Sequence, residues 1–189
     1  HEGAIRKVSL ELLAQARILG EASGDPVLAA VLGKNAADIA NLAGQYGADK
    51  VFLAEDDKLA DYTTGAYTSV LAALVRKEEP KAVLLGNTAI GKDLAPRLAQ
   101  RLGVGMASDC TGMEADAADF LRFTRPIYGG KAFAQLTLTA SPVLATIRPN
   151  TFPSGNPDAG RAFEVVSVDA AIDPKDLRAI VKEVALAAS

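Results

Sequence analysis

The sequence predicts an α/β fold, a doubly wound and mainly parallel sheet with an antiparallel extension. Helix and strand patterns alternate in units of roughly 30 residues through the first half of the chain, which is typical of parallel strands joined by crossover helices. Several apolar runs are short and continuous, as in strands that are buried on both faces. From Ala107 onward, strand-like segments are separated only by Gly or Pro turns, so the middle ones leave no room for helices.

The first half supplies the helices and strands of the parallel sheet. A first helix is expected over residues 9–21, with Ser9 as its N-cap and apolar residues spaced by three and four. Asn35 is expected to cap a second helix that ends near Gly47. A later helix is followed by Gly103, which favours a left-handed stop. The other expected elements are strands at 27–32, 51–54 and 82–85 and helices at 65–77 and 92–102.

The second half supplies the extension and a terminal helix. Asp173 and Pro174 form an N-cap and first-turn pair, and Leu177, Ile180, Val181 and Val184 lie on one face of the helix that they predict. Such a helix packs back on its own domain or leads toward a further one. The expected strands of the antiparallel or mixed extension are 121–124, 133–139, 143–147 and 163–168.

The expected domain division places one α/β domain at residues 1–170 and a terminal helix or linker at 171–189. A doubly wound sheet normally begins with a strand, whereas residues 1–7 are polar and run directly into a helix. We therefore expect the first strand of the domain to be missing.

Composition excludes several classes of function. The 189 residues are 49% hydrophobic and 23% charged, which is enough apolar material for the core of one folded domain. With 20 basic against 23 acidic residues, no basic excess is available to bind nucleic acid. A single cysteine, Cys110, and a single histidine, His1, exclude an internal disulfide, a zinc site and a His-based triad. No apolar run approaches the roughly 18 residues of a membrane span, and no signal peptide opens the chain, so an intracellular, most simply cytoplasmic, protein is expected.

A glycine-rich loop at residues 86–93 is the sharpest local motif. Gly86, Gly91 and Lys92 satisfy the spacing GxxxxGK of a phosphate-binding loop, but the final Ser/Thr that would hold magnesium is replaced by Asp93. That carboxylate would repel a phosphate and satisfy the N–H groups of the first helical turn instead. The favoured interpretation is therefore a capped helix, not nucleotide hydrolysis.

Two arginines stand where strands give way to turns. Arg125 opens the segment Arg125–Gly130, which includes Tyr128, and Arg148 precedes a proline. Arginine in such a place clamps a carboxylate or phosphate, fixes a loop through an ion pair, or contacts a partner chain; the last two are favoured. Cys110 is interpreted as a small buried hydrophobe, because a nucleophilic role would need a base. No catalytic residue and no metal ligand is assigned.

Several motifs in register carry a resemblance to a known family. Residues 8–13, 46–51, 86–98, 109–112, 125–130 and 145–150 resemble, in order and spacing, the alpha subunit of electron transfer flavoproteins. The match spans residues 8 to 150. It implies the amino-terminal domain of that subunit, a Rossmann-like sheet of the adenine nucleotide alpha hydrolase-like type.

The resemblance also implies a function. Family members are heterodimers that carry electrons from flavin dehydrogenases to a membrane quinone reductase by means of FAD, so an electron carrier rather than an enzyme is implied. The family holds FAD mainly in a carboxy-terminal domain, toward which residues 171–189 would lead, and this chain alone is not expected to bind it. The implied role here is a scaffold that docks the beta subunit. Lys92, Asp93 and Arg97 would stabilise the domain, and Arg125, Tyr128 and Arg148 would face the partner or the flavin.

Two other classes of function remain open at the level of sequence. A stand-alone adenine-nucleotide-binding module of the universal-stress type would use residues 86–92 as a phosphate cradle. A lyase or hydrolase that uses Asp109 and Arg125 ranks third, because no positioned acid and base pair is visible.

Overall fold

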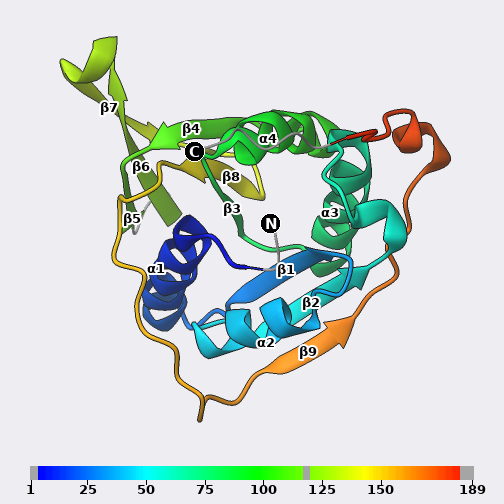
Figure 1. Cartoon of the computed structure of the whole chain (residues 1–189). Helices are drawn as coiled ribbons and strands as arrows, with labels where there is room; N and C mark the ends of the chain where they lie inside the picture. Colours follow the sequence, from blue (N-terminus) through cyan, green and yellow to red (C-terminus); the bar gives the residue numbers. More distant parts are fainter. Residues whose placement is uncertain (1–3, 117–119, 184–189) are drawn as a thin grey trace.

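The computed structural model describes residues 4–116 and 120–183, which form α/β layers with a projecting antiparallel hairpin (Figure 1). The helices are α1 (Lys7–Ser23), α2 (Ala37–Gln45), α3 (Thr64–Glu78) and α4 (Ala89–Leu102). The strands are β1 (Leu28–Gly33), β2 (Lys50–Glu55), β3 (Ala82–Gly86), β4 (Met106–Cys110), β5 (Gly112–Asp116), β6 (Phe120–Ile127), β7 (Ala132–Thr137), β8 (Val143–Ile147) and β9 (Glu164–Ser167). Three short 3₁₀ turns are η1 (Asp57–Leu59), η2 (Tyr128–Gly130) and η3 (Pro174–Leu177).

The strands form two parallel sheets and one antiparallel sheet. The orders are β1-β2-β9 and β3-β8-β4 for the parallel sheets and β5-β6-β7 for the antiparallel one. The predicted α/β class, mainly parallel with an antiparallel extension, is therefore confirmed. The pattern of pairing differs from the expectation in that the parallel strands form two sheets, since β1 and β3 are not hydrogen-bonded to each other.

Two strands expected in the extension belong to the parallel sheets instead. β8 pairs with β3 on one side and β4 on the other, and all five of its residues are buried. β9 pairs parallel with β2. The continuous apolar run of β8 indicated a strand buried on both faces of a sheet. The residues around it did not indicate that this strand would lie between β3 and β4, which precede it in the chain.

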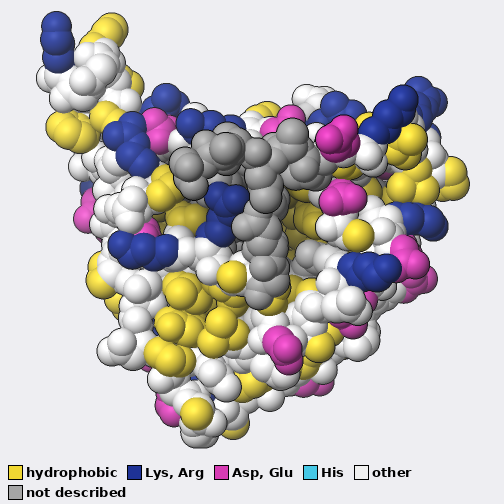
Figure 2. Space-filling model, in the orientation of Figure 1, with side chains coloured by type: hydrophobic (Ala, Val, Ile, Leu, Met, Phe, Trp, Pro, Cys, Tyr) yellow, Lys and Arg dark blue, Asp and Glu magenta, His cyan; other side chains and the backbone are white. Residues whose placement is uncertain are grey.

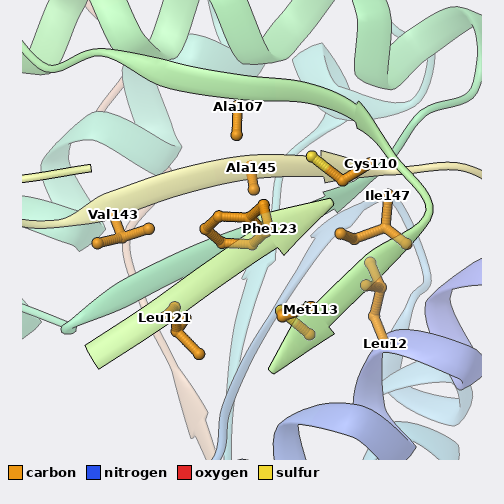
Figure 3. Packing of buried hydrophobic residues seen from close by; sticks show 9 residues of the cluster. All are labelled: Leu12, Ala107, Cys110, Met113, Leu121, Phe123, Val143, Ala145 and Ile147. Carbon is orange, nitrogen blue, oxygen red and sulfur yellow. The ribbon is translucent and has the colours of Figure 1, made fainter. Parts of the chain in front are cut away.

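Helices cover both faces of the parallel sheets. Successive side chains of a strand point to opposite faces, so the apolar residues of one strand pack against helices on both sides. In β2, Val51 and Leu53 pack with α2, whereas Ala54 packs with α3. In β8, Leu144 packs with α4, whereas Ile147 packs with Leu12 of α1 and with the antiparallel sheet. Figure 3 shows this last cluster, in which Phe123 of β6 lies beneath the small side chains of β4 and β8.

The ends of two helices correct the predicted caps. α1 begins at Lys7 and has Arg6 at its N-cap position, so Ser9 lies inside the first turn. Asn35 does not cap α2; it adopts a left-handed φ of 54°, and the N-cap position falls to Ala36, whose N–H donates to Glu55 Oε1 at 2.6 Å. Gly103 ends α4 with a φ of 73°, as expected.

The predicted terminal helix does not form over the described residues. Asp173 caps η3 by accepting the Lys175 N–H at 3.0 Å, but the 3₁₀ turn ends at Leu177 and residues 178–183 are not helical. Leu177 packs on the core, whereas the side chain of Ile180 is 75% exposed. Because Ile180 and Val181 remain exposed, the apolar pattern gains too little burial here to sustain a helix. Val184 lies outside the described residues.

Candidate functional site

A cavity of about 560 Å³ lies where the β6–β7 hairpin joins the carboxyl edge of the β3-β8-β4 sheet. The hairpin and its turn η2 project from the body of the molecule, at the upper left of Figure 1. In this way the turn lies beside the ends of strands that are far from it in sequence. The cavity is lined by Asp109, Arg125, Pro126, Ile127, Tyr128, Gly129, Gly130 and Arg148.

A network of polar side chains fixes the floor of the cavity. Arg148 donates to both carboxylate oxygens of Asp109, from Nε at 3.0 Å and from Nη2 at 2.6 Å. Asn87 donates from Nδ2 to Asp109 Oδ1 at 2.6 Å, and the buried Thr146 hydroxyl donates to Asn87 Oδ1 at 3.1 Å. The carboxylate thus has three hydrogen-bond donors from the ends of two strands.

Electrostatics in the network keep Asp109 ionised. Hydrogen bonding and charge from Arg148 hold the pKa of the Asp109 carboxyl below its usual range, against the opposing effect of partial burial. The same pair raises the pKa of Arg148. A carboxylate engaged in this way is a poor general base, so the geometry gives no support to a lyase or hydrolase that uses Asp109.

Arg125 lies in the wall of the cavity and is less completely paired. Its Nη1 donates to Ser108 Oγ at 3.1 Å, while its Nε is buried without a hydrogen-bond partner. The guanidinium of Arg125 thus places a positive charge in the wall of the cavity without an acidic partner of its own among the described residues. Arg125 and Asp109 line the same cavity, but the partner of the Asp109 carboxylate is Arg148.

The outer end of the site is an exposed turn with an aromatic side chain. Tyr128, Gly129 and Gly130 all have positive φ values, of 51°, 65° and 87°. Glycine adopts positive φ values without a steric cost, so Gly129 and Gly130 tolerate this turn. Tyr128 has a Cβ and is the one residue of the three whose backbone is strained. The side chains of Tyr128 and Phe133 are 80% and 65% exposed, which is unusual for two large apolar residues on one hairpin.

The glycine-rich loop leads from β3 into α4, as the motif predicted. The Thr88 hydroxyl caps α4 by accepting the Gly91 N–H at 3.2 Å. A Cβ at Gly91 would lie 1.8 Å from the carbonyl oxygen of Gly86, so only glycine fits there. Lys92 and Arg97 are exposed on α4.

Asp93 has a different role from the expected cap. Its carboxylate accepts hydrogen bonds from the hydroxyls of Tyr62, at 2.7 Å, and Thr64. These bonds hold the pKa of Asp93 below its usual range, with Thr64 as the largest cause. Asp93 therefore joins α4 to the start of α3.

Cys110 lies next to the site but faces the core. It is fully buried beside Phe123 and Ile147, and burial raises the pKa of its thiol to about 11. The thiol is therefore protonated at neutral pH, which agrees with its interpretation as a small hydrophobe. Over residues 4–116 and 120–183, no group of three potential metal ligands is found, and no helix has the length and apolarity to cross a bilayer.

The structure brings Arg125, Tyr128 and Arg148 to one cavity, whereas Lys92, Asp93 and Arg97 lie along α4. Asn87 and Thr146 were not singled out from the sequence. Each stands at or near the carboxyl end of a strand, which was the available signal, but only the insertion of β8 beside β3 places them in contact.

Fold and site together define a Rossmann-like α/β domain that carries a projecting hairpin and a cavity lined by two arginines and an aspartate. A profile of the electron transfer flavoprotein domain matches residues 1–173. The chain belongs to the electron transfer flavoprotein family, which confirms the resemblance seen in its motifs.

Relatives support the same assignment. The Bacillus subtilis protein named electron transfer flavoprotein subunit alpha is 40% identical over 184 residues, which cover 97% of this chain and 55% of that protein. The Syntrophomonas wolfei protein of the same name is 44% identical over 155 residues, covering 82% of this chain and 47% of the relative. A protein from Anaerotignum propionicum, named acryloyl-CoA reductase electron transfer subunit beta, is 32% identical and covers 96% of this chain and 58% of its own length. The chain thus spans about half the length of the curated relatives that it matches.

Proposed function

We propose that this chain is the subunit-docking domain of an electron transfer flavoprotein and that the β6–β7 hairpin is the arm that contacts a beta-type subunit. One observation carries the proposal: the hairpin projects with Tyr128 and Phe133 exposed beside a cavity lined by two arginines. Aromatic and arginine side chains are the types that contribute most to protein interfaces. The proposed role in the complete protein is to carry electrons between flavin dehydrogenases and a quinone reductase, with FAD as the redox group.

The cavity does not fit a whole FAD molecule. Its charged members are two arginines and one aspartate, and the paired Asp109 cancels the charge of Arg148. Its only aromatic side chain, Tyr128, stands at the exposed rim and leaves no enclosed apolar wall for a flavin ring. We therefore propose that FAD is held by another part of the complete protein and that the cavity receives an acidic group of the partner subunit.

Co-purification with a beta-type subunit tests the proposed arm. Tyr128→Ser combined with Phe133→Ser should raise the dissociation constant for the partner about 30-fold. That increase corresponds to the loss of about 2 kcal/mol of binding free energy, which is typical of a hot-spot residue. Ile18→Ser is the matched control, because Ile18 is a large apolar residue that is 57% exposed on α1. Equal retention of the partner by both variants would contradict the assignment of the arm.

Charge reversal tests the cavity separately. Arg125→Glu should weaken assembly, because it puts a negative charge in the cavity wall where an acidic group of the partner is proposed to bind. Lys77→Glu is the control, because it makes the same change of charge at an exposed position on α3, outside both the hairpin and the cavity lining. Assembly that responds equally to both changes would indicate general electrostatic attraction in place of a specific contact.

Spectroscopy and calorimetry distinguish the remaining alternatives. The isolated chain should show no flavin absorbance, and it should gain none until the complete flavoprotein is assembled. Titration with AMP should give no heat at about 1 mM, whereas micromolar affinity, near −8 kcal/mol, would favour the stand-alone nucleotide-binding module.

A further inference from the structure

A buried carboxylate on α1 contacts the loop that follows β8. The Glu11 side chain is 0% exposed, and a charged group at such depth is costly unless it is paired or hydrogen-bonded. Lys7, on the same helix, lies 4.0 Å from Glu11 and donates to Asn150 Oδ1 at 3.0 Å, but most of its side chain is in solvent. The hydrogen bonds of Glu11 are with the backbone: Oε1 accepts the Asn150 N–H at 3.1 Å, and Oε2 accepts the Thr151 N–H at 3.2 Å. The loop therefore satisfies the carboxylate, and the carboxylate fixes the loop.

The two N–H groups belong to a tight turn at residues 148–151. Its second residue is Pro149, and its third, Asn150, has a left-handed φ of 62°, which is the pattern of a type II turn. The Thr151 hydroxyl donates to the Arg148 carbonyl oxygen at 2.6 Å and closes the turn. A left-handed residue with a Cβ costs free energy, so the turn needs contacts that hold it in place. The carboxylate on α1 provides two of these contacts.

Arg148 stands at the first position of this turn and reaches the cavity from there. Its backbone N–H donates to the Cys110 carbonyl oxygen at 2.9 Å, and its guanidinium makes the two-bond contact with Asp109. The side chain of Arg148 is 47% exposed, so packing alone does not fix its orientation. Figure 2 shows basic side chains, with acidic ones among them, at the base of the projecting hairpin. A two-bond contact requires the planes of guanidinium and carboxylate to be aligned, so it depends on where the turn holds the backbone of Arg148.

We propose that Glu11 is a positioning residue for Arg148. By fixing the turn from α1, the buried carboxylate holds the guanidinium against Asp109 and keeps this pair in the wall of the cavity. Without Glu11, Asp109 would face the cavity as an unpaired negative charge. The effect on partner binding rests on the proposed docking function, whereas the effect on the contact of Arg148 with Asp109 does not.

The pKa of the Asp109 carboxyl reports whether Arg148 is in place. The arginine is the largest cause of its lowered pKa, with a smaller effect from Lys92, which every variant keeps. Glu11→Gln retains the shape of the side chain but replaces one acceptor oxygen by an NH₂ group, which cannot accept an N–H. It should raise the pKa of Asp109 by about 0.5 or more, measured by carbon-13 NMR titration of the carboxyl carbon. Glu21→Gln, at a position that is 65% exposed on the same helix, is the matched control and should leave this pKa unchanged.

A second background distinguishes positioning from general stabilisation. Once Arg148→Met has removed the guanidinium, Glu11→Gln should no longer change the pKa of Asp109, because the group that it positions is gone. Thr151→Val removes the hydroxyl contact with the Arg148 carbonyl oxygen, should also raise this pKa, and replaces Glu11→Gln in the test if that variant does not fold. An unchanged pKa of Asp109 in the folded variant would overturn the proposal. Equal changes in both backgrounds would overturn it too, because they would indicate a general loss of structure around the site.

The dissociation constant for a beta-type subunit separates this inference from the proposed function. Glu11→Gln and Arg148→Met should each raise it, because an unpaired Asp109 repels the acidic group that is proposed to enter the cavity. The double variant should bind no more weakly than Arg148→Met alone. If the pKa of Asp109 rises but the dissociation constant stays the same, the positioning role is supported and the proposed docking role of the cavity is contradicted. If the pKa of Asp109 is unchanged, the positioning role is overturned whatever the partner does.

Discussion

Glu11 is a fully buried carboxylate that organises the loop after β8. It accepts hydrogen bonds from the backbone N–H groups of Asn150, at 3.1 Å, and Thr151, at 3.2 Å. Glu11→Ala should destabilise the protein by about 3 kcal/mol, because it leaves two N–H groups without an acceptor and removes buried volume. Urea denaturation at neutral pH measures the change.

A surface carboxylate on the same helix provides the comparison. Glu21 pairs with Arg17 at 3.0 Å, but 65% of its side chain is exposed. Glu21→Ala should change the free energy of unfolding by less than about 0.5 kcal/mol, as solvent-exposed pairs on a helix do. Similar losses for the two variants would show that the contacts of Glu11 with the loop do not stabilise the fold.

Asp109 should make the free energy of unfolding depend on pH in the acid range. Its folded pKa lies below the unfolded value of about 3.9, so its contribution to stability is complete above that value and is lost as pH falls through the folded pKa. Asp109→Asn should therefore lower stability at pH 7 and flatten the acid limb of the curve. Urea midpoints from about pH 6 to pH 2.5 would test this, and parallel curves for the two proteins would contradict it.

At the scale of elements, the turn from β3 to α4 depends on a close approach of two backbone segments. A Cβ at Gly91 would meet the Gly86 carbonyl oxygen at 1.8 Å, and that oxygen belongs to the backbone, not to a flexible side chain. Gly91→Ala should thus destabilise the protein by about 2 kcal/mol or more. Gly105→Ala, where nothing lies within 4 Å, should stay within about 0.5 kcal/mol. Equal thermal midpoints would show that the loop relaxes freely.

Local sequence patterns predicted most helices and strands. The predictions that differ from the structure depend on contacts between segments that are far apart in the chain. β3 and α4 follow from short-range signals, namely a continuous apolar run and a stripe of apolar residues closed by Gly103. β8 was predicted as a strand with the bounds that it has, but its position between β3 and β4 depends on contacts across the chain. The predicted terminal helix is replaced over the described residues by the 3₁₀ turn η3, because Leu177 is packed on the core but Ile180 and Val181 of the same face stay exposed.

The candidate site shows the same division between local and long-range information. Arg125 and Arg148 were singled out because arginines at strand ends face loops, and both line the cavity. The bidentate contact of Arg148 with Asp109, and the support from Asn87, could not be predicted, since these residues are brought together only by the order of strands in the sheet. Sequence therefore indicates which side chains are available, and topology decides which of them meet.

At the scale of the whole molecule, two strands with the same parallel pairing should differ widely in stability. β8 is buried throughout and paired on both sides, whereas β9 is paired only with β2 and three of its four residues are exposed. Amides of β8 should exchange only through global unfolding, and those of β9 should exchange at least about 100-fold faster through local opening.

Native-state hydrogen exchange at several low concentrations of denaturant measures this difference. Openings of β9 should show little dependence on denaturant, because little surface is exposed when an edge strand detaches. Those of β8 should follow the slope of complete unfolding, since releasing this strand breaks the pairing of β3 and β4 and opens the clusters on both of its faces. If β9 were as protected and as sensitive to denaturant as β8, the two parallel sheets would unfold as one cooperative unit, and the division between β1 and β3 would not weaken their coupling.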